Sequence, residues 1–351
     1  MTGAAAPSLP SRMRAAVWRG PGRPLTVEEL PTPRVEEPED VVIRVRAAMF
    51  GAALVRAVTV GHPRLSPPAV LGTLVVGDIV ETGAAVQHLK PGQRVTLDPH
   101  PPCGHCDNCR DGLQALCSTK ISISPGAHAE YVRIRPPVAT HARPVPPGVS
   151  AGEALLTEIV ACVLDATHTA GIGPGQDVLV IGCGPVGLIQ VRLARLQGAQ
   201  RVFCSVNHPG RRHLVRQAGG VPVAAEDLSA EHMAVLTAGR GPHVVVEAVG
   251  SAATYASAFE VVRDGGTVVG FGGCPSGTTI PLDLNAVHYR RIRFVGSYHY
   301  APGVFEEAAR LLETGQIDLK PLLTHRIPLD RIADAVATAR RPDCLVPVVE
   351  P

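Results

Sequence analysis

The sequence predicts a two-domain α/β protein in which a β-rich first part is followed by a doubly wound parallel sheet. Up to about residue 150, short alternating runs such as MRAAVW and DVVIRVRAA are separated by turns rich in proline and glycine, which is typical of an all-β domain. Beyond Ser150, apolar strands alternate with helix-length segments. A glycine-rich turn joins one of these strands to the next helix.

The composition favours a small molecule as the partner. The 351 residues suffice for two domains of ordinary size. Hydrophobic residues make up 45% and charged residues 18%, and the net charge of +2 gives no reason to expect binding to nucleic acid or a membrane. No apolar run reaches the roughly 18 residues of a membrane-spanning helix, and the first residues lack the apolar core of a signal peptide, so we expect a cytoplasmic protein.

The second part of the chain is predicted in more detail. Its β–α alternation, with apolar strands suited to a sheet covered on both faces, indicates a parallel sheet. The predicted elements are a helix over 151–170, a strand over 178–181 with its following helix, a strand over 201–206, a strand over 243–248, a helix over 252–263, a strand over 267–271, a strand over 292–297 and a helix over 304–313.

The glycine turn has the spacing of a dinucleotide-binding motif. Gly182, Gly184 and Gly187 form G-x-G-x-x-G. The first glycine permits a tight turn, the second lets the backbone approach a pyrophosphate, and the third lets helix and strand pack closely. Residues expected to bind the cofactor are Gly182, Gly184, Pro185, Val186, Gly187, Val206, Asn207, Arg211 and Val249.

The end of the next strand indicates which nicotinamide cofactor is bound. An NAD site usually has Asp or Glu there, roughly 20 residues beyond the motif, to bind the ribose hydroxyls. This chain has Val206, followed by Arg211 and Arg212, and an arginine can pair with a 2′-phosphate. The sequence therefore favours NADP, with NAD as the alternative if both arginines only face solvent.

Four cysteines form a predicted metal lobe. Cys103, Cys106, Cys109 and Cys117 have the spacing C-x2-C-x2-C-x7-C, which suits a tetrahedral structural zinc; an iron–sulfur cluster is the alternative. Because four sulfurs complete the shell, His105 is expected to be a bystander. The remaining cysteines lie in apolar surroundings and are expected in the core; they are Cys162, Cys183, Cys204, Cys274 and Cys344.

These features together resemble the medium-chain dehydrogenase/reductase family, in its zinc-containing alcohol and polyol dehydrogenase branch. The resemblance covers LKPGQRV, AEYVRI, GIGPGQDVLVIGCGPVG and VVVEAVG. It implies a GroES-like catalytic domain from residues 13–152 and 290–351, a Rossmann domain over 153–289, and an oxidoreductase assembled as a homodimer or homotetramer.

The chain departs from this family where a second, catalytic zinc is usually bound. The segment that supplies a cysteine and a proton-relaying hydroxyl is Phe50-Gly51-Ala52-Ala53 here, and the family's Gly-His-Glu is Gly72-Thr73-Leu74. Glu158 matches an acid near the metal in the polyol branch, but one carboxylate falls short of three protein ligands. We therefore expect one structural zinc per chain, no catalytic zinc, and the ring of Phe50 in the vacated space.

Without that zinc, the resemblance leaves three functions open. The first is hydride transfer between the cofactor and a polar alcohol or ketone, sugar- or cyclitol-like, with a side chain as acid/base. The second is reduction of the double bond of an enone or quinone, and the third is a non-catalytic NADPH-binding scaffold. His100 is the first candidate for acid/base catalysis and His299 the second. Glu158 either supports catalysis by hydrogen-bonding to the backbone or the substrate, or only faces solvent. Other side chains placed near the cleft by the resemblance are Asp98, His128, Tyr298 and Tyr300.

Overall fold

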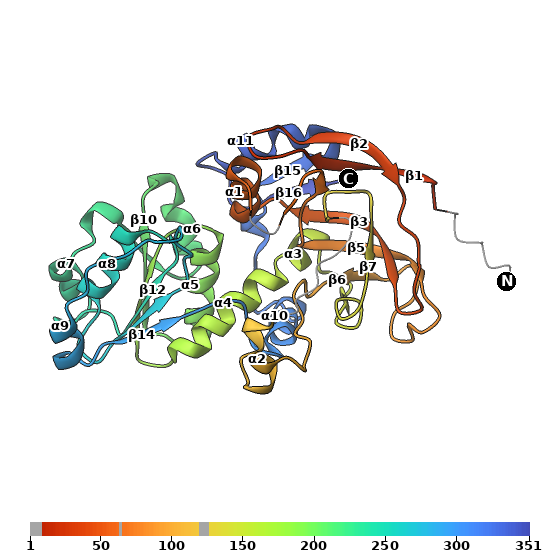
Figure 1. Ribbon diagram of the computed structural model, residues 1–351. Helices are drawn as coiled ribbons and strands as arrows, with labels where there is room; N and C mark the ends of the chain where they lie inside the picture. Colours follow the sequence, from red (N-terminus) through yellow and green to blue (C-terminus); the bar gives the residue numbers. More distant parts are fainter. Residues whose placement is uncertain (1–8, 63–64, 119–125) are drawn as a thin grey trace. The chain divides into compact units, whose positions relative to one another are not determined.

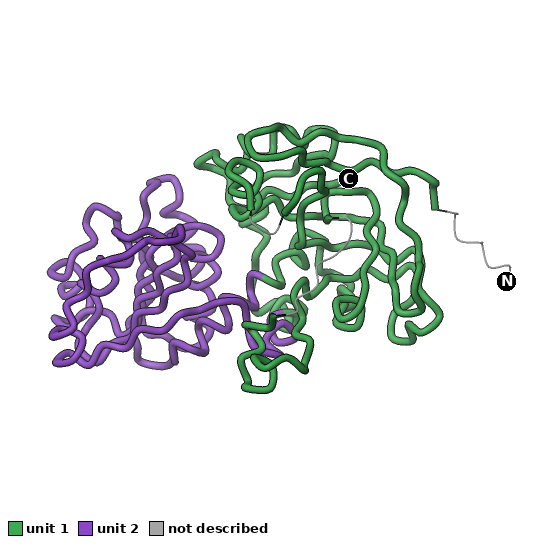
Figure 2. The backbone as a smooth tube through the Cα atoms, in the orientation of Figure 1, with its two compact units in different colours: residues 1–158, 309–351 green, residues 159–308 purple. Residues whose placement is uncertain are grey.

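The computed structural model describes residues 9–62, 65–118 and 126–351, and the chain forms two compact units (Figures 1 and 2). Unit 1 comprises Met1–Glu158 and Ala309–Pro351, and unit 2 comprises Ile159–Ala308. The predicted second domain ends at residue 289, whereas unit 2 continues to Ala308. The structure ends it later because the strand over Arg293–Gly296 pairs with the sheet of unit 2.

Unit 2 is built on a six-stranded sheet with the order β11-β10-β9-β12-β13-β14. Every neighbouring pair of these strands is parallel. The order reverses between β9 and β12, where a doubly wound sheet binds its dinucleotide. The strands are β9 (Asp177–Ile181), β10 (Arg201–Val206), β11 (Val221–Ala224), β12 (Val244–Glu247), β13 (Thr267–Gly270) and β14 (Arg293–Gly296).

Helices connect these strands. The central strands β9 and β12 are wholly buried, as expected for a sheet covered on both faces. Except for the helix predicted over 151–170, the predicted strands and helices of this unit are confirmed to within two residues at each end. The helices are α4 (Thr157–Ala170), α5 (Pro185–Leu196), α6 (Arg212–Gln217), α7 (Ala230–Leu236), α8 (Ala252–Val261), α9 (Leu284–Tyr289) and α10 (Val304–Glu313).

The single helix predicted over 151–170 is wrong, because it is divided into α3 (Ala151–Leu155) and α4. A capping box between Ser150 and Glu153 begins α3. The hydroxyls of Thr157 and Thr96 both donate to the Ala154 carbonyl, at 2.8 and 3.0 Å. These bonds compete with the backbone bond that would continue the helix, so it breaks here.

Unit 1 contains one three-stranded sheet, β2-β1-β4, and one larger sheet, β15-β16-β3-β5-β6-β8, with β7 also paired to β3. Buried apolar clusters form its core. The strands are β1 (Arg12–Trp18), β2 (Thr26–Pro31), β3 (Val41–Met49), β4 (Ala69–Val70), β5 (Val75–Thr82), β6 (Arg94–Thr96), β7 (Tyr131–Ile134), β8 (Arg143–Pro144), β15 (His325–Pro328) and β16 (Pro347–Glu350). The helices besides α3 are α1 (Ala52–Val60), α2 (Asp107–Arg110) and α11 (Ala335–Ala339).

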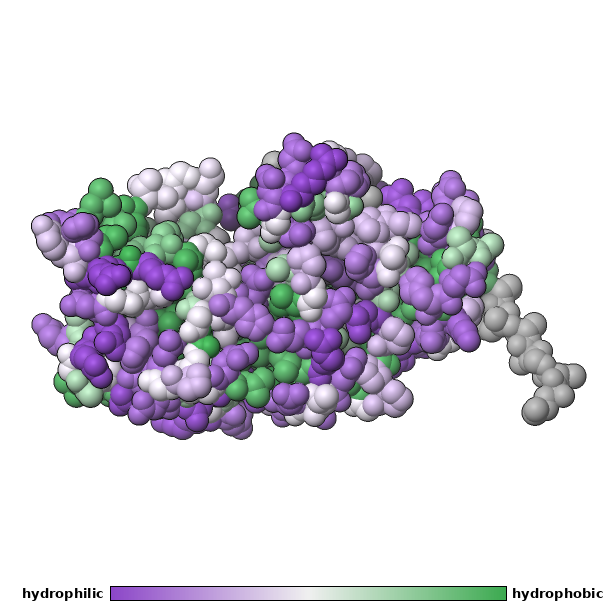
Figure 3. Space-filling model, turned by 90° about the horizontal axis from the view of Figure 1, so that it is seen from below, coloured by the Kyte–Doolittle hydropathy of each residue, from purple (hydrophilic) through white to green (hydrophobic). Residues whose placement is uncertain are grey.

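The surface mixes polar and apolar residues. On the face drawn in Figure 3, green apolar residues are interspersed with purple polar ones. Among the described residues, no helix has both the length and the apolar character that crossing a membrane requires.

Candidate functional site

The glycine turn between β9 and α5 is tightly fixed. Gly182 has a φ of +115°, which strongly favours glycine, and its N–H donates to the Ser205 hydroxyl at 3.0 Å. A Cβ at Gly187 would lie 1.9 Å from the Gly182 carbonyl oxygen, whereas a Cβ at Gly184 would meet no atom within 4 Å. The first and third glycines therefore build the turn, and the second leaves open space beside the N-terminus of α5, where a pyrophosphate fits.

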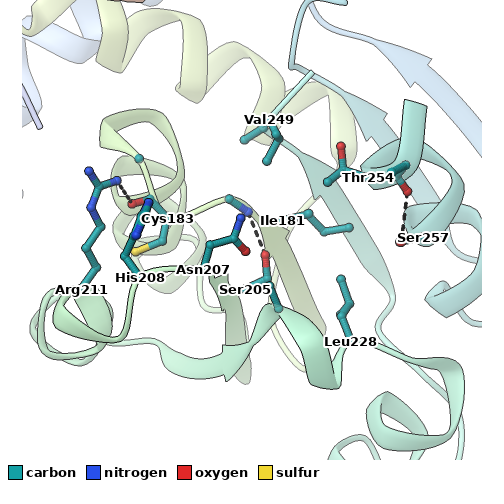
Figure 4. A pocket seen from close by; sticks show the side chains of 15 residues that line it. Ile181, Cys183, Ser205, Asn207, His208, Arg211, Leu228, Val249, Thr254 and Ser257 are labelled. Atoms are coloured by element: carbon teal, nitrogen blue, oxygen red, sulfur yellow. Dashed lines mark hydrogen bonds between the residues drawn. The ribbon is translucent and has the colours of Figure 1, made fainter. Parts of the chain in front are cut away.

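A pocket of about 360 Å³ lies over this turn, within unit 2 (Figure 4). Asn207, His208 and Arg211 lie on one side of it, and Val249 and Thr254 on the other. Arg211 Nη1 donates to the Cys183 carbonyl oxygen at 3.0 Å, which holds the guanidinium at the pocket. The described lining contains no Asp or Glu, so its side chains offer a positive charge and hydrogen-bond donors to an anionic ligand.

The pocket gathers many of the predicted cofactor residues. Gly182, Gly184, Asn207, Arg211 and Val249 line it. The others play a different part: Pro185 and Val186 open α5, Gly187 packs the helix on the strand, and Val206 is only 2% exposed. Lining residues that sequence reasoning missed include Ser205, His208, Thr254 and Ser257.

A buried carboxylate, which the sequence analysis also missed, positions one wall of the pocket. Glu247 ends β12 and is 0% exposed. Its Oε1 accepts hydrogen bonds from the backbone N–H groups of Val249 and Gly250, each at 2.9 Å. The bend that brings Val249 to the pocket is therefore fixed from inside the sheet.

The cysteine lobe in unit 1 fits one tetrahedral ion. Sulfur atoms are 3.5 Å apart in Cys106–Cys109 and 3.9 Å apart in Cys103–Cys109 and Cys106–Cys117. Zinc–sulfur bonds of about 2.3 Å in a tetrahedron give separations near 3.8 Å. All four sulfurs lie within 4.8 Å of one another, which suits a single ion better than a cluster with bridging sulfides. His105 is exposed and is not one of this set, as predicted.

Hydrogen bonds to sulfur support the same interpretation. The backbone N–H of Cys106 donates to the sulfur of Cys103, and that of Cys103 to the sulfur of Cys117, both at 3.3 Å. Backbone hydrogen bonds at Ser118 and Cys109 lower the pKa of the Cys106 thiol to about 7. Such bonds favour the thiolate form that binds metal.

Comparisons with known proteins agree with this architecture. Residues 37–147 match the alcohol dehydrogenase GroES-like domain, and residues 185–314 match the family described as zinc-binding dehydrogenase. An L-threonine 3-dehydrogenase of Chelativorans sp. is 32% identical over 95% of this chain and 97% of its own. The chain belongs to the medium-chain dehydrogenase/reductase family.

Two further relatives extend the comparison. A sorbitol dehydrogenase of Bacillus subtilis is 29% identical over 98% of this chain and 99% of its own. A Sinorhizobium meliloti protein described as a zinc-binding dehydrogenase, solved with NADP bound, has a TM-score of 0.89 and 29% identity and covers 97% of this chain and 100% of its own. The expected GroES-like and Rossmann fold is confirmed, and this medium-chain dehydrogenase/reductase catalyses NAD(P)-dependent oxidoreduction of the alcohol dehydrogenase type.

The positions where the resemblance places the family's catalytic zinc ligands are packed with other groups in this chain. Phe50 is 0% exposed, and its ring lies 5.4 Å from that of His128, centroid to centroid. A Cβ at Gly72 would come within 3.1 Å of the His128 ring. Burial lowers the pKa of His128 to about 4, so this histidine is neutral at pH 7 and acts as a core residue. These residues do not fit a zinc ion.

The first acid/base candidate, His100, lies in the loop after β6. It is partly exposed, and its backbone N–H donates to the Asp98 carboxylate at 3.0 Å. Asp98 itself is only 6% exposed, which leaves it a role in shaping this loop.

The other two candidate catalytic residues, His299 and Glu158, lie close together. Glu158, Cys162 and His299 present a carboxylate oxygen, a sulfur and a ring nitrogen within 4.8 Å of one another. The expectation that all five scattered cysteines lie in the core is wrong, because Cys162 and Cys274 are partly exposed. The residue that sequence reasoning missed here is Cys162, and the only available signal was its position one helical turn after Glu158.

Proposed function

We propose that this dehydrogenase uses NADP(H) to interconvert a polar alcohol, sugar- or cyclitol-like, and the corresponding ketone. The pocket supports NADP(H) as the cofactor, because its described lining has Arg211 and His208 but no carboxylate. A carboxylate there would bind the ribose hydroxyls of NAD and repel a 2′-phosphate, whereas a guanidinium pairs with phosphate. The NADP-bound relative from Sinorhizobium meliloti supports the same choice.

The relatives support the substrate class. They include enzymes named for sorbitol, L-threonine and L-galactonate, which are all polar compounds with hydroxyl groups. NADP⁺ held at the glycine turn and by Arg211 would supply the acceptor for a hydride from the carbinol carbon, and a base would take the hydroxyl proton. No zinc at the family's usual position assists this step in our proposal, because Phe50 and His128 fill that position.

Steady-state kinetics with both cofactors tests the proposal. We expect kcat/KM for a polar ketone to be at least 10-fold higher with NADPH than with NADH. Arg211→Ala should remove most of that preference by raising the KM for NADPH, since one charge-assisted hydrogen bond to phosphate contributes about 1.5–3 kcal/mol. Arg216→Ala, at an exposed arginine of α6, is the control. It should change neither the cofactor preference nor the KM for NADPH.

Other outcomes would contradict the substrate assignment. Turnover of conjugated enones without turnover of ketones would identify a double-bond reductase. Tight NADPH binding without turnover of either class would identify a non-catalytic scaffold.

As the proton carrier we infer His100, which lies in the segment that lines the substrate cleft in the family. His100→Ala should leave the NADPH dissociation constant unchanged and lower kcat by 10²- to 10⁴-fold, the usual contribution of a general acid/base. His213→Ala, at an exposed histidine of α6, is the matched control. Unchanged kcat in His100→Ala would remove this residue from the reaction.

A further inference from the structure

One side chain of the glycine turn has no part in the proposed binding of the cofactor. Cys183 stands between Gly182 and Gly184, where the dinucleotide motif accepts any residue. It lines the pocket over the turn and is 8% exposed, and its carbonyl oxygen accepts the hydrogen bond that holds Arg211 (Figure 4). A thiol therefore lies at the wall of the pocket, within reach of a small solute that enters it.

A second cysteine contacts Cys183 from the sheet. Cys204 is 0% exposed in β10, the strand that pairs with β9. Its sulfur lies 3.7 Å from the carbonyl oxygen of Gly182, the residue directly before Cys183. The two thiols are hydrogen-bonded to each other, with Cys204 as the donor. Both cysteines belong to unit 2, so a single compact unit fixes the pair.

The surroundings make Cys183 the more reactive thiol of the pair. The hydrogen bond from Cys204 lowers the pKa of the Cys183 thiol, and the guanidinium of Arg211 lowers it further, although burial opposes both. The thiolate is the nucleophilic form of cysteine. Because Cys204 is closed to solvent, an oxidant must react with Cys183 first.

We propose that Cys183 and Cys204 form a reversible disulfide that hydrogen peroxide generates and that weakens binding of the dinucleotide. The Cys183 thiolate attacks one peroxide oxygen: the S–O bond forms, the O–O bond breaks, and hydroxide leaves and takes up the proton that Cys183 released. Cys204 then attacks the sulfenic sulfur, so that the S–S bond forms, the S–O bond breaks, and water leaves with the Cys204 proton. The two thiols lose two electrons, and the peroxide is reduced to two molecules of water.

The disulfide should change the pocket because it moves the turn. An S–S bond of about 2.05 Å is shorter than any contact between two thiols, so Cys183 must approach Cys204. Gly182 and Gly184 are covalently bonded to Cys183, and Arg211 is held by its carbonyl oxygen. The path of the pyrophosphate and the guanidinium therefore both shift. This effect rests on the proposed function, in which NADP(H) occupies the pocket.

Peptide mapping of the full chain tests the disulfide. After treatment with hydrogen peroxide and alkylation of the remaining thiols, trypsin separates the two cysteines, since Arg192, Arg195 and Arg201 lie between them. Mass spectrometry should find the peptides of Cys183 and Cys204 joined, and a dithiol reductant should release them. Saturating NADP⁺ should slow this cross-linking at least 10-fold, because the cofactor covers Cys183 in the pocket.

Titration with NADPH measures the effect on binding. Once the peroxide has been removed, the dissociation constant for NADPH should be at least 10-fold higher than before treatment, and the reductant should restore the original value. Cys183→Ser should give the same dissociation constant before and after treatment. Cys274→Ser, which changes a partly exposed cysteine of the same unit, is the control and should lose affinity as the wild type does.

A second variant assigns the order of the two steps. Cys204→Ser should form no cross-linked peptide and should leave Cys183 as a sulfenic acid, which dimedone traps. If this variant fails to fold, the peptide map of the wild type still decides whether the disulfide forms.

Two results would overturn the proposal. One is the absence of the joined peptides in the peroxide-treated wild type without cofactor, whether both thiols remain open to alkylation or Cys183 stops at the sulfenic acid. The other is a cross-linked protein whose affinity for NADPH is unchanged. A wild type that binds no NADPH before treatment would contradict the proposed function instead, and the joined peptides would still be detected.

Discussion

Gly184 and Gly187 belong to the same turn, but alanine would meet different surroundings at each. Gly184 has backbone angles of φ −92° and ψ −174°, which alanine adopts readily, and a Cβ there would have no neighbour within 4 Å. A Cβ at Gly187 would overlap the Gly182 carbonyl oxygen at 1.9 Å. Gly184 therefore leaves space for a ligand, whereas Gly187 is required by the packing of the turn itself.

We expect Gly184→Ala to keep the wild-type free energy of unfolding and to raise the NADPH dissociation constant at least 10-fold, because the methyl group occupies the path of the pyrophosphate. Gly187→Ala should lower the free energy of unfolding by about 1–3 kcal/mol, the usual cost of overpacking. Urea unfolding followed by circular dichroism and NADPH titration by fluorescence measure the two effects. Wild-type NADPH affinity in Gly184→Ala would contradict a dinucleotide site at this turn.

The helices and strands whose bounds follow from the pattern of their own residues were predictable from sequence. The strand over Arg201–Val206 and the helix over Val304–Glu313 begin and end where their patterns do. The break between α3 and α4 was not predictable. It depends on a hydroxyl from Thr96, which reaches Ala154 from a strand far away in sequence. Local propensity carries no signal of such a tertiary bond.

The residues of the candidate sites also differ in how well the sequence predicts them. The glycine turn and the cysteine lobe are short, continuous motifs, so their spacing predicts both. Cys162 and His299 are distant in sequence, and apolar neighbours made Cys162 resemble a core residue. The bond from Ala301 to Asp165 brings the two together. The sequence spacing also placed Val206 at the ribose position, whereas Val206 is buried and Ser205 and Asn207 line the pocket.

At the scale of the whole molecule, the sheet of unit 2 ends with an exposed apolar strand. Phe294 in β14 is 55% exposed, and its ring packs against Phe259 and Tyr255 at 5.3 and 6.3 Å. Leu284 and Tyr289 of the preceding helix are 73% and 76% exposed. An open edge strand with apolar neighbours readily pairs with another chain. We propose that this edge joins two copies in the homodimer or homotetramer expected from the family.

Phe294→Arg should therefore shift the protein to a smaller assembly, because two copies related by a twofold axis would bring the introduced charges together. Light scattering coupled to size-exclusion chromatography measures the mass. Val235→Arg, at a residue of α7 that is 81% exposed, is the control and should leave the mass unchanged. An unchanged mass in Phe294→Arg would place any subunit interface elsewhere.

The strand β16 has a consequence for how the chain folds as it is synthesised. It pairs with β3 and β15 and so enters the larger sheet of unit 1, although all of unit 2 separates it from β3 in sequence. Unit 2 is continuous and can fold as soon as it leaves the ribosome. The end of β3 at Ala48 and Met49 stays unpaired on this side until β16 has been synthesised, so the larger sheet of unit 1 is completed later. During translation, the nucleotide-binding half therefore completes its fold before the half that begins the chain.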